Sequence, residues 1–388
     1  MVTVRSFAKI NLGLCIGALR PDGFHDLRTV YQAIALHDVI RVEVGRGTGV
    51  EIRCQDPRVP KDESNTCYWI VERAMAPLRV RGRVVIEIEK RLPVQGGLGG
   101  ASSNAVAALL ALERAVKKSL PAAERLRIAA EVGSDLPLFL VGGTVLGVGR
   151  GEEVYPLPDL PATPCVVATP DMGVPTPMAF AAWDAQFPHG LEPAALASRD
   201  GTAEAVPFPR GERKTASGGI EAGELRSAWT LRLRSGQATE GGRPHTSMAE
   251  LTDLTPSDRM IQFGRAIAAW QSGFQNKPGK VYSGVPASGR GRAETSLLDL
   301  VRTGIENDFE QVVFPQYPEF RKVKRALERG GAFYASLSGS GSATYGLFRS
   351  GQAAEKAAAR LRKHGIEALA TTTLTRPQYW KKFLVSSL

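Results

Sequence analysis

The stretch Leu92-Pro-Val-Gln-Gly-Gly-Leu-Gly-Gly-Ala-Ser-Ser-Asn-Ala105 places four glycines within five positions and follows them with two serines. Glycine carries no Cβ, so the backbone amides of such a loop can crowd around an anion. The serines can cap the apolar helix that is predicted to run to about residue 116, which leaves its first N–H groups facing that anion. The stretch indicates a phosphate-binding loop, although a plain turn between a strand and a helix can have the same composition.

Two common phosphate motifs are excluded at this loop. No Lys-Ser or Lys-Thr pair closes it, as a Walker A loop requires. The GxGxxG dinucleotide fingerprint is also absent, because Ala101 and Ser102 stand where its spacing needs a third glycine.

The loop is similar to the phosphate loop of the GHMP small-molecule kinases, which has the form Pro-x-x-x-Gly-Leu-Gly-x-Ser-Ser. One extra residue precedes the serines here, and Ala101 replaces a glycine. The residues that fall in the family pattern are Pro93, Gly97, Leu98, Gly99, Ser102 and Ser103. The resemblance implies that the loop binds ATP, with Gly96, Gly100 and Ala101 taking part.

Four further segments resemble one branch of that family, the 4-diphosphocytidyl-2-C-methyl-D-erythritol kinases. Residues 6–14 read Ser-Phe-Ala-Lys-Ile-Asn-Leu-Gly-Leu, and residues 20–25 read Arg-Pro-Asp-Gly-Phe-His. Residues 133–137 read Gly-Ser-Asp-Leu-Pro, and residues 337–344 read Leu-Ser-Gly-Ser-Gly-Ser-Ala-Thr. Phe24 replaces the usual tyrosine, and Ser134 replaces the usual alanine. The resemblance implies ATP-dependent phosphorylation of the 2-hydroxyl of the cytidyl substrate, with Mg²⁺ as cofactor.

Strands and helices are predicted in mixed order, without a regular βαβ repeat, which favours an α+β fold. Strands are expected at residues 2–18, 27–44, 49–53, 84–89, 142–149, 165–169, 332–337, 343–348 and 366–373. Helices are expected at residues 65–78, 102–116, 122–131, 175–183, 257–270, 317–329 and 352–364, with short ones beginning near Asp135 and Asn307.

The resemblance implies two domains of the GHMP kinase fold. Residues 1–160 would form an ATP-binding domain like ribosomal S5, and residues 161–388 a ferredoxin-like domain. The segments at about 190–248 and 272–296 have no recognisable counterpart and little periodicity. We expect them to be disordered insertions.

Asp135 is the candidate catalytic base. A carboxylate beside the substrate hydroxyl could accept its proton as the new P–O bond forms. From the residues alone, Asp135 could equally cap the short helix that contains Pro137. The resemblance favours catalysis.

Lys9 is the second candidate catalytic residue. It lies between Ala8 and Ile10 in a strand-like segment, where an ammonium group needs a partner. It could pair with Asp135 and keep that carboxylate ionised, or its stem could lie along the surface. Asn11 faces the same side of the strand and could bind the substrate.

The resemblance also implies a site for the cytidine base and its diphosphate. Phe24 and His25 would grip the cytosine ring, although a lone histidine in a turn can be structural. Gly339 and Gly341 would bring backbone amides close to the substrate phosphates, although they could form a plain hairpin turn. Asp171, Gly173 and Phe180 would line the cytidine pocket. No protein ligand for Mg²⁺ is assigned beyond Ser103 as a candidate.

Composition limits the other partners. The 388 residues carry a formal charge of +10 with 7% aromatic residues, and no basic run reaches five, which argues against nucleic acid. The four cysteines show no CxxC spacing, so a zinc site is not expected and reduced thiols in the cytoplasm are the default. No apolar run is long enough to span a membrane. We expect a monomer or a homodimer.

Two alternatives stay open. Another GHMP kinase could act on mevalonate, homoserine or a sugar, and the Asp-Gly-Phe-His turn argues against it. A non-catalytic nucleotide or RNA binder would fit the basic charge, but it would not need both Lys9 and Asp135.

Overall fold

The computed structural model of the protein describes residues 1–94, 96–187 and 306–385. All of these residues belong to one compact unit of the chain. The helix expected at 257–270 and the insertions expected at 190–248 and 272–296 lie outside the described residues.

The first half of the described chain is built on a sheet whose long central strand is β2 (His25–Gly45). β2 pairs antiparallel with β1 (Val2–Leu19), β4 (Arg83–Glu89) and β5 (Thr144–Val148). β3 (Val50–Cys54) adds parallel to β4, and β6 (Glu153–Pro156) adds antiparallel to β5. The long alternating segments at the N-terminus are strands, as predicted.

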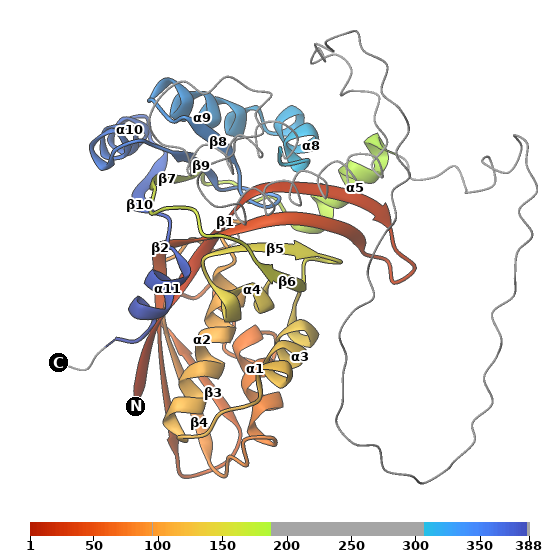
Figure 1. Ribbon diagram of the computed structural model, residues 1–388, viewed down its shortest axis with the longest axis vertical. Helices are drawn as coiled ribbons and strands as arrows, with labels where there is room; N and C mark the ends of the chain where they lie inside the picture. The colour runs from red at the N-terminus through yellow and green to blue at the C-terminus, as the bar shows by residue number, and fades with distance from the viewer. Residues whose placement is uncertain (95, 188–305, 386–388) are drawn as a thin grey trace, which may run out of the picture. The chain divides into compact units, whose positions relative to one another are not determined.

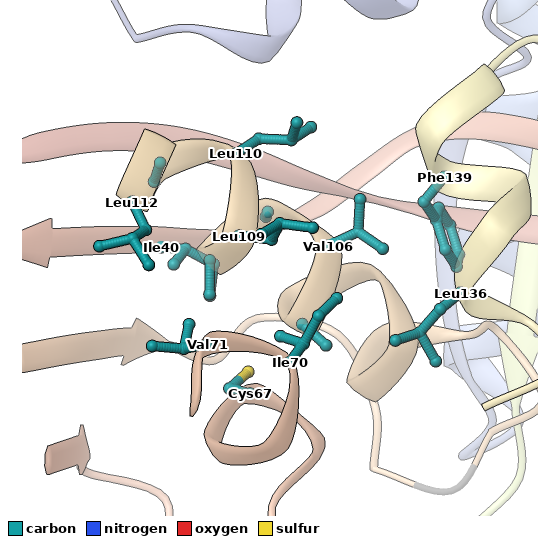
Figure 2. Packing of buried hydrophobic residues seen from close by; sticks show 14 of the residues in the cluster. Ile40, Cys67, Ile70, Val71, Val106, Leu109, Leu110, Leu112, Leu136 and Phe139 are labelled. Atoms are coloured by element: carbon teal, nitrogen blue, oxygen red, sulfur yellow. The ribbon is translucent and has the colours of Figure 1, made fainter. Parts of the chain in front are cut away.

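Helices α1 (Thr66–Met75), α2 (Gly100–Ala115) and α4 (Leu136–Val141) pack on this sheet, and α3 (Ala122–Val132) packs on α1 and α4 (Figure 1). Figure 2 shows Val106 and Leu109 of α2 in the same buried core as Ile70 and Val71 of α1. The helical spacing of these apolar residues places them on one face, so their burial holds α2 against its neighbours. Asn65 caps α1 by accepting a hydrogen bond from the amide of Cys67, as predicted.

The second sheet has the strand order β10-β7-β9-β8 and is antiparallel. Its strands are β7 (Pro164–Thr169), β8 (Tyr334–Leu337), β9 (Thr344–Leu347) and β10 (Glu367–Thr372). α9 (Pro318–Arg329) and α10 (Gly351–Lys363) cover its outer face (Figure 1). This order and the helix placement are those of a ferredoxin-like βαββαβ unit, which confirms the predicted α+β fold.

The two sheets face each other across a shared apolar layer. Ile10 of β1 is buried in one cluster with Val167 of β7 and Tyr345 of β9. The Tyr345 hydroxyl donates to the carbonyl of Asn11 at 2.7 Å. These contacts place the N-terminal strand β1, which carries Lys9 and Asn11, against the second sheet.

One expectation is corrected, and two elements were not predicted. The serines do not cap α2, because the helix begins at Gly100 and its N-cap is Gly99, which has a φ of +69°. A glycine without a Cβ adopts this left-handed conformation readily, so the helix can begin inside the glycine loop. The strand β6 was not predicted because it is only four residues long. The helix α11 (Arg376–Phe383) was not predicted either. It is short, but Thr375 and Gln378 form a capping box that marks its start.

The boundary predicted between residues 160 and 161 stays a prediction. The two sheets divide between β6 and β7, whereas α11 returns to the first sheet and packs against β1. There the Tyr379 hydroxyl donates to the carbonyl of Phe139 in α4 at 2.9 Å.

Candidate active site

Lys9 extends from β1 into a buried polar cluster. Its side chain is 4% exposed, and its Nζ donates to Asn11 Oδ1 at 2.7 Å and lies 3.5 Å from Asp135 Oδ2. Lys9 and Asn11 share a face of β1 because side chains two positions apart point the same way. Asn11 Nδ2 in turn donates to Thr29 Oγ1 at 2.7 Å, which fixes the amide with its oxygen toward the ammonium. The structure therefore brings Lys9, Asn11 and Asp135 together, as the sequence predicted.

Asp135 is the N-cap residue of α4 by position, but its side chain makes no capping hydrogen bond. Its Oδ1 accepts instead from the Tyr31 hydroxyl at 3.0 Å, while Oδ2 faces Lys9. The alternative that Asp135 caps its helix through its side chain is therefore wrong. The carboxylate is held by the Lys9 ammonium and the Tyr31 phenol. It is nevertheless 35% exposed and so reaches solvent.

Tyr31 is a site residue that sequence reasoning missed. It pairs with Asn11 in the β1–β2 ladder, and the strand pattern marks it only as one more alternating apolar position. Burial, and then the charge of Asp135, raise the pKa of Tyr31 well above its usual value. The phenol therefore stays protonated and donates to the carboxylate.

The glycine loop passes directly over this cluster. The amide of Lys9 donates to the carbonyl of Leu98 at 3.0 Å, and a Cβ added at Gly99 would lie 3.1 Å from the Lys9 side chain. Gly97 and Gly99 both have positive φ values, +72° and +69°. The loop therefore needs glycine at these positions for its conformation and for its close approach to β1.

The two serines of the loop face different ways. Ser103 is 2% exposed, donates to the carbonyl of Phe7 at 2.6 Å and accepts from Ser6 Oγ at 2.7 Å. Ser102 lines a cavity of about 350 Å³ on the outer side of the loop. Of the two serines, Ser102 lines the cavity, whereas the hydroxyl of Ser103 is engaged with β1.

The cavity beside the loop contains polar residues that were not predicted as site residues. Asn65 and Thr66 at the start of α1, Lys90 after β4 and Asn104 in α2 all lie on its wall. The other lining residues include Pro93, Gly96, Gly97, Leu98, Gly99, Gly100 and Ala101. Only Asn65 carried a sequence signal, as a helix cap. The predicted ATP-binding residues, except Ser103, therefore line a single cavity.

The second glycine turn, between β8 and β9, closes over the same cluster. Gly339 and Gly341 have φ values of +58° and +97°, and a Cβ at Gly339 would lie 3.7 Å from both Lys9 Nζ and Asn11 Oδ1. Ser338 Oγ donates to the carbonyl of Gly97 at 3.0 Å, and the amide of Ala343 donates to that of Gly96 at 3.1 Å. The two glycine motifs, far apart in sequence, are therefore joined by hydrogen bonds above Lys9.

His25 lies at the start of β2 and is 5% exposed. Its ring stacks on Phe180 of α5 (Thr176–Gln186), with centroids 5.1 Å apart and planes 6° apart. Nδ1 faces the carbonyl of Gly17 at 3.1 Å, and Nε2 lies 3.0 Å from Asp184 Oδ1. Asp184 was not predicted, because its place one turn after Phe180 gives no signal without the position of His25.

The other predicted substrate-binding residues do not gather around this ring. Phe24 is 51% exposed. The guanidinium carbon of Arg150 lies 5.0 Å from the centroid of the Phe24 ring. Asp171 and Gly173 line a separate cavity of about 460 Å³, together with Pro93 and residues near β4. The structure therefore places Phe180 with His25, while Asp171 and Gly173 lie nearer the glycine loop.

Two family models match the chain. The model for the GHMP kinases N terminal domain matches residues 65–143, and the model for GHMP kinases C terminal matches residues 293–367. Within the described ranges, no helix combines the length and the apolar character that crossing a membrane requires.

Several curated proteins are similar over most of the chain. The 4-diphosphocytidyl-2-C-methyl-D-erythritol kinase of Solibacter usitatus (strain Ellin6076) is 33% identical over 346 residues, covering 89% of this chain and 81% of that protein. The kinase of the same name from Desulfitobacterium hafniense (strain Y51) is 30% identical over 376 residues, covering 97% of each.

Solved structures share the fold. The crystal structure of a 4-(cytidine 5'-diphospho)-2C-methyl-D-erythritol kinase has a TM-score of 0.58 at 24% identity, covering 96% of this chain and 98% of that one. A homoserine kinase from Cytophaga hutchinsonii reaches 0.59 at 19% identity, covering 96% and 94%. The fold alone thus does not separate these kinases, but the sequence relatives do. The chain belongs to the family of the 4-diphosphocytidyl-2-C-methyl-D-erythritol kinases.

Proposed function

We propose that the protein transfers the γ-phosphoryl group of ATP to the 2-hydroxyl of 4-diphosphocytidyl-2-C-methyl-D-erythritol, within the non-mevalonate route to isoprenoid precursors. The observation that carries the proposal is the cluster of buried Lys9 and Asn11 with the partly exposed Asp135, beneath two glycine turns. Phosphoryl transfer needs held phosphates, neutralised charge and an aimed oxygen, and this cluster can supply them.

The glycine loop is the proposed phosphate site. Its amides precede α2, whose N-terminus carries a partial positive charge that favours anions. Mg²⁺ bound to the ATP phosphates would neutralise charge during the transfer. Ser102, which lines the cavity, replaces the predicted Ser103 as the candidate oxygen donor, because the Ser103 hydroxyl is hydrogen-bonded to Phe7 and Ser6.

Asp135 is the proposed base. As the substrate oxygen bonds to the γ-phosphorus, its proton passes to the carboxylate and the bond from phosphorus to the ADP oxygen breaks. Lys9 would stabilise negative charge on the attacking oxygen. Asn11 holds Lys9 in place through its Oδ1.

His25, Phe24 and Phe180 are proposed to form the site of the cytosine base. Both imidazole nitrogens of His25 have partners within the protein, Gly17 and Asp184, so its proposed part is to hold Phe180 and Asp184 in place. Gly339 and Gly341 would approach the acceptor diphosphate with backbone amides. Asp171 and Gly173 stay proposed as substrate-binding residues on the neighbouring wall. A cytoplasmic location and a monomeric or homodimeric state remain predictions.

A coupled ADP-release assay tests the function directly. We expect ADP release with ATP, Mg²⁺ and the cytidyl acceptor, and none with mevalonate, homoserine or galactose. Release with one of those acceptors instead would assign the chain to another GHMP activity. ATP binding without acceptor-dependent release would favour the non-catalytic alternative.

Tyr31→Phe tests the support of the proposed base. The variant keeps the ring and removes the hydrogen bond to Asp135 Oδ1. Hydrogen bonds to charged groups contribute about 1.5–3 kcal/mol, so we expect kcat to fall about tenfold while the KM for ATP is unchanged. Tyr155→Phe is the control, because it removes a hydroxyl from a tyrosine that is 51% exposed, and it should leave kcat unchanged. An unchanged kcat in Tyr31→Phe would argue against this role.

His25→Ala separates the cytidyl activity from the other GHMP activities. Stacking on a base contributes about 1–3 kcal/mol, so we expect the KM for the cytidyl substrate to rise about tenfold. Discrimination against the uridine analogue should be lost, because removing the imidazole releases Phe180 and Asp184, which it contacts. The KM for ATP should not change. Intact base discrimination would contradict the assignment of His25.

A further inference from the structure

Asp38 is a carboxylate of β2 that is fully buried and is not among the residues of the proposed reaction. Its Oδ1 accepts from the amides of Arg91 and Leu92, both at 2.7 Å. Its Oδ2 accepts from Lys90 Nζ at 2.7 Å and from Asn104 Nδ2 at 2.9 Å. The four donors satisfy the carboxylate, so Asp38 itself has no capacity left for a ligand.

These donors lie on both sides of the glycine loop. Arg91 and Leu92 lead from β4 into the loop, and Asn104 lies one turn into α2, where the loop ends. One carboxylate on a sheet strand therefore fixes the entry and the exit of the loop. Hydrogen bonds to a charged acceptor are stronger than neutral ones, so this attachment is firm.

Asp38 also fixes a cation beside the loop. The side chain of Lys90 is 9% exposed, and its Nζ lies 3.4 Å from the position that a Cβ on Gly100 would occupy. Lys90 and Asn104 both line the cavity that contains the loop. A buried ammonium stays charged and in place only if it has a partner, and Asp38 is that partner.

We propose that Asp38 is a positioning residue for the nucleotide: it sets Lys90 and both ends of the glycine loop in the geometry that receives the donor phosphates. The inference rests on the proposed function only in taking this cavity as the ATP site. It does not depend on the identity of the acceptor.

The test is equilibrium binding of Mg·ATP to Asp38→Asn, with thermal unfolding measured alongside. The new amide can still accept from Arg91 and Leu92 through Oδ1, but its NH₂ group would face the donors of Lys90 and Asn104. We expect the Kd for Mg·ATP to rise about tenfold or more, because a small displacement of the loop misplaces every phosphate contact. The KM for the acceptor should change less than the Kd for Mg·ATP, since Lys9, Asn11 and Asp135 keep their contacts with one another.

Glu113→Gln is the matched control. Glu113 is 5% exposed and accepts from the Leu120 amide and from Arg125 Nε, both at 2.8 Å, at the far end of α2. The same exchange of acid for amide should lower the unfolding temperature and leave the Kd for Mg·ATP unchanged. Equal changes of Kd in both variants, or a wild-type Kd in folded Asp38→Asn, would overturn the proposal.

A pair of double variants keeps the test decisive if Asp38→Asn does not fold. Asp38→Asn with Lys90→Met removes both buried charges together, and Glu113→Gln with Arg125→Met does so at the control site. Weaker Mg·ATP binding in the first pair alone supports the proposal, and equal binding in both pairs refutes it. Absence of ADP release with the cytidyl acceptor would refute the proposed function and leave these binding results standing.

Discussion

Asp135→Asn is expected to lower kcat by about 10²–10⁴-fold, the range attributed to a placed general base. The amide can still accept a hydrogen bond from Tyr31, but it cannot take the proton of the substrate hydroxyl. It also leaves Lys9 without its counter-charge, 3.5 Å away in the wild-type chain. Because the side chain of Lys9 is only 4% exposed and loses this counter-charge, we also expect a lower free energy of unfolding.

The measurement is single-turnover phosphoryl transfer with saturating ATP, together with the Kd for ATP, which should be unchanged. Glu131→Gln is the control, since Glu131 pairs with Arg127 on the surface of α3, four residues before Asp135. A variant Asp135→Asn with near-normal turnover would remove the carboxylate from the mechanism.

Gly97→Ala is expected to reduce kcat/KM for ATP by about 10²-fold, because it displaces the loop that holds the phosphates. The backbone at Gly97 has a φ of +72°, which costs a residue with a side chain about 1–3 kcal/mol. The new Cβ would also lie 2.2 Å from the carbonyl oxygen of Ser338 and 3.0 Å from that of Gly341. Both neighbours are backbone atoms, so the loop or the facing turn has to move.

Gly331→Ala separates strain from displacement. Gly331 has a φ of +96° after α9, and a Cβ there would meet nothing within 4 Å. We expect this control to lower the unfolding temperature and to leave the kinetics intact. If Gly97→Ala loses no more activity than Gly331→Ala, the contact between the two glycine turns does not matter for catalysis.

Much of the fold could be predicted because its elements carry local signals. The alternating strands before residue 45 and the amphipathic helix α9 have periods that depend only on neighbouring residues. The pairing of Lys9 with Asp135 was also predicted, because a lysine among apolar neighbours needs a partner and the family resemblance indicated Asp135. β6 has no comparable pattern.

The remaining site residues depend on contacts that no local pattern encodes. In the sequence, Tyr31 has no feature that distinguishes it from other strand residues. Its role depends on Asp135, which lies more than 100 positions later in the chain. Asp38 and Asp184 are ordinary acids in the sequence, and only the folded chain shows what each one holds. For the serines of the glycine loop, the local signal was strong but wrong. Serine is a favoured helix cap, but Gly99 adopts the N-cap position and α2 begins before the serines.

The hydrogen bonds that the carbonyls of Gly96 and Gly97 accept from Ala343 and Ser338 bear on protein engineering. A chimera that joined the first sheet of this chain to the second sheet of a relative would replace the partners of its own nucleotide loop. Such hybrids should recover activity only when the β8–β9 turn is transplanted together with the loop. The two motifs form one unit of recombination, although about 240 residues separate them.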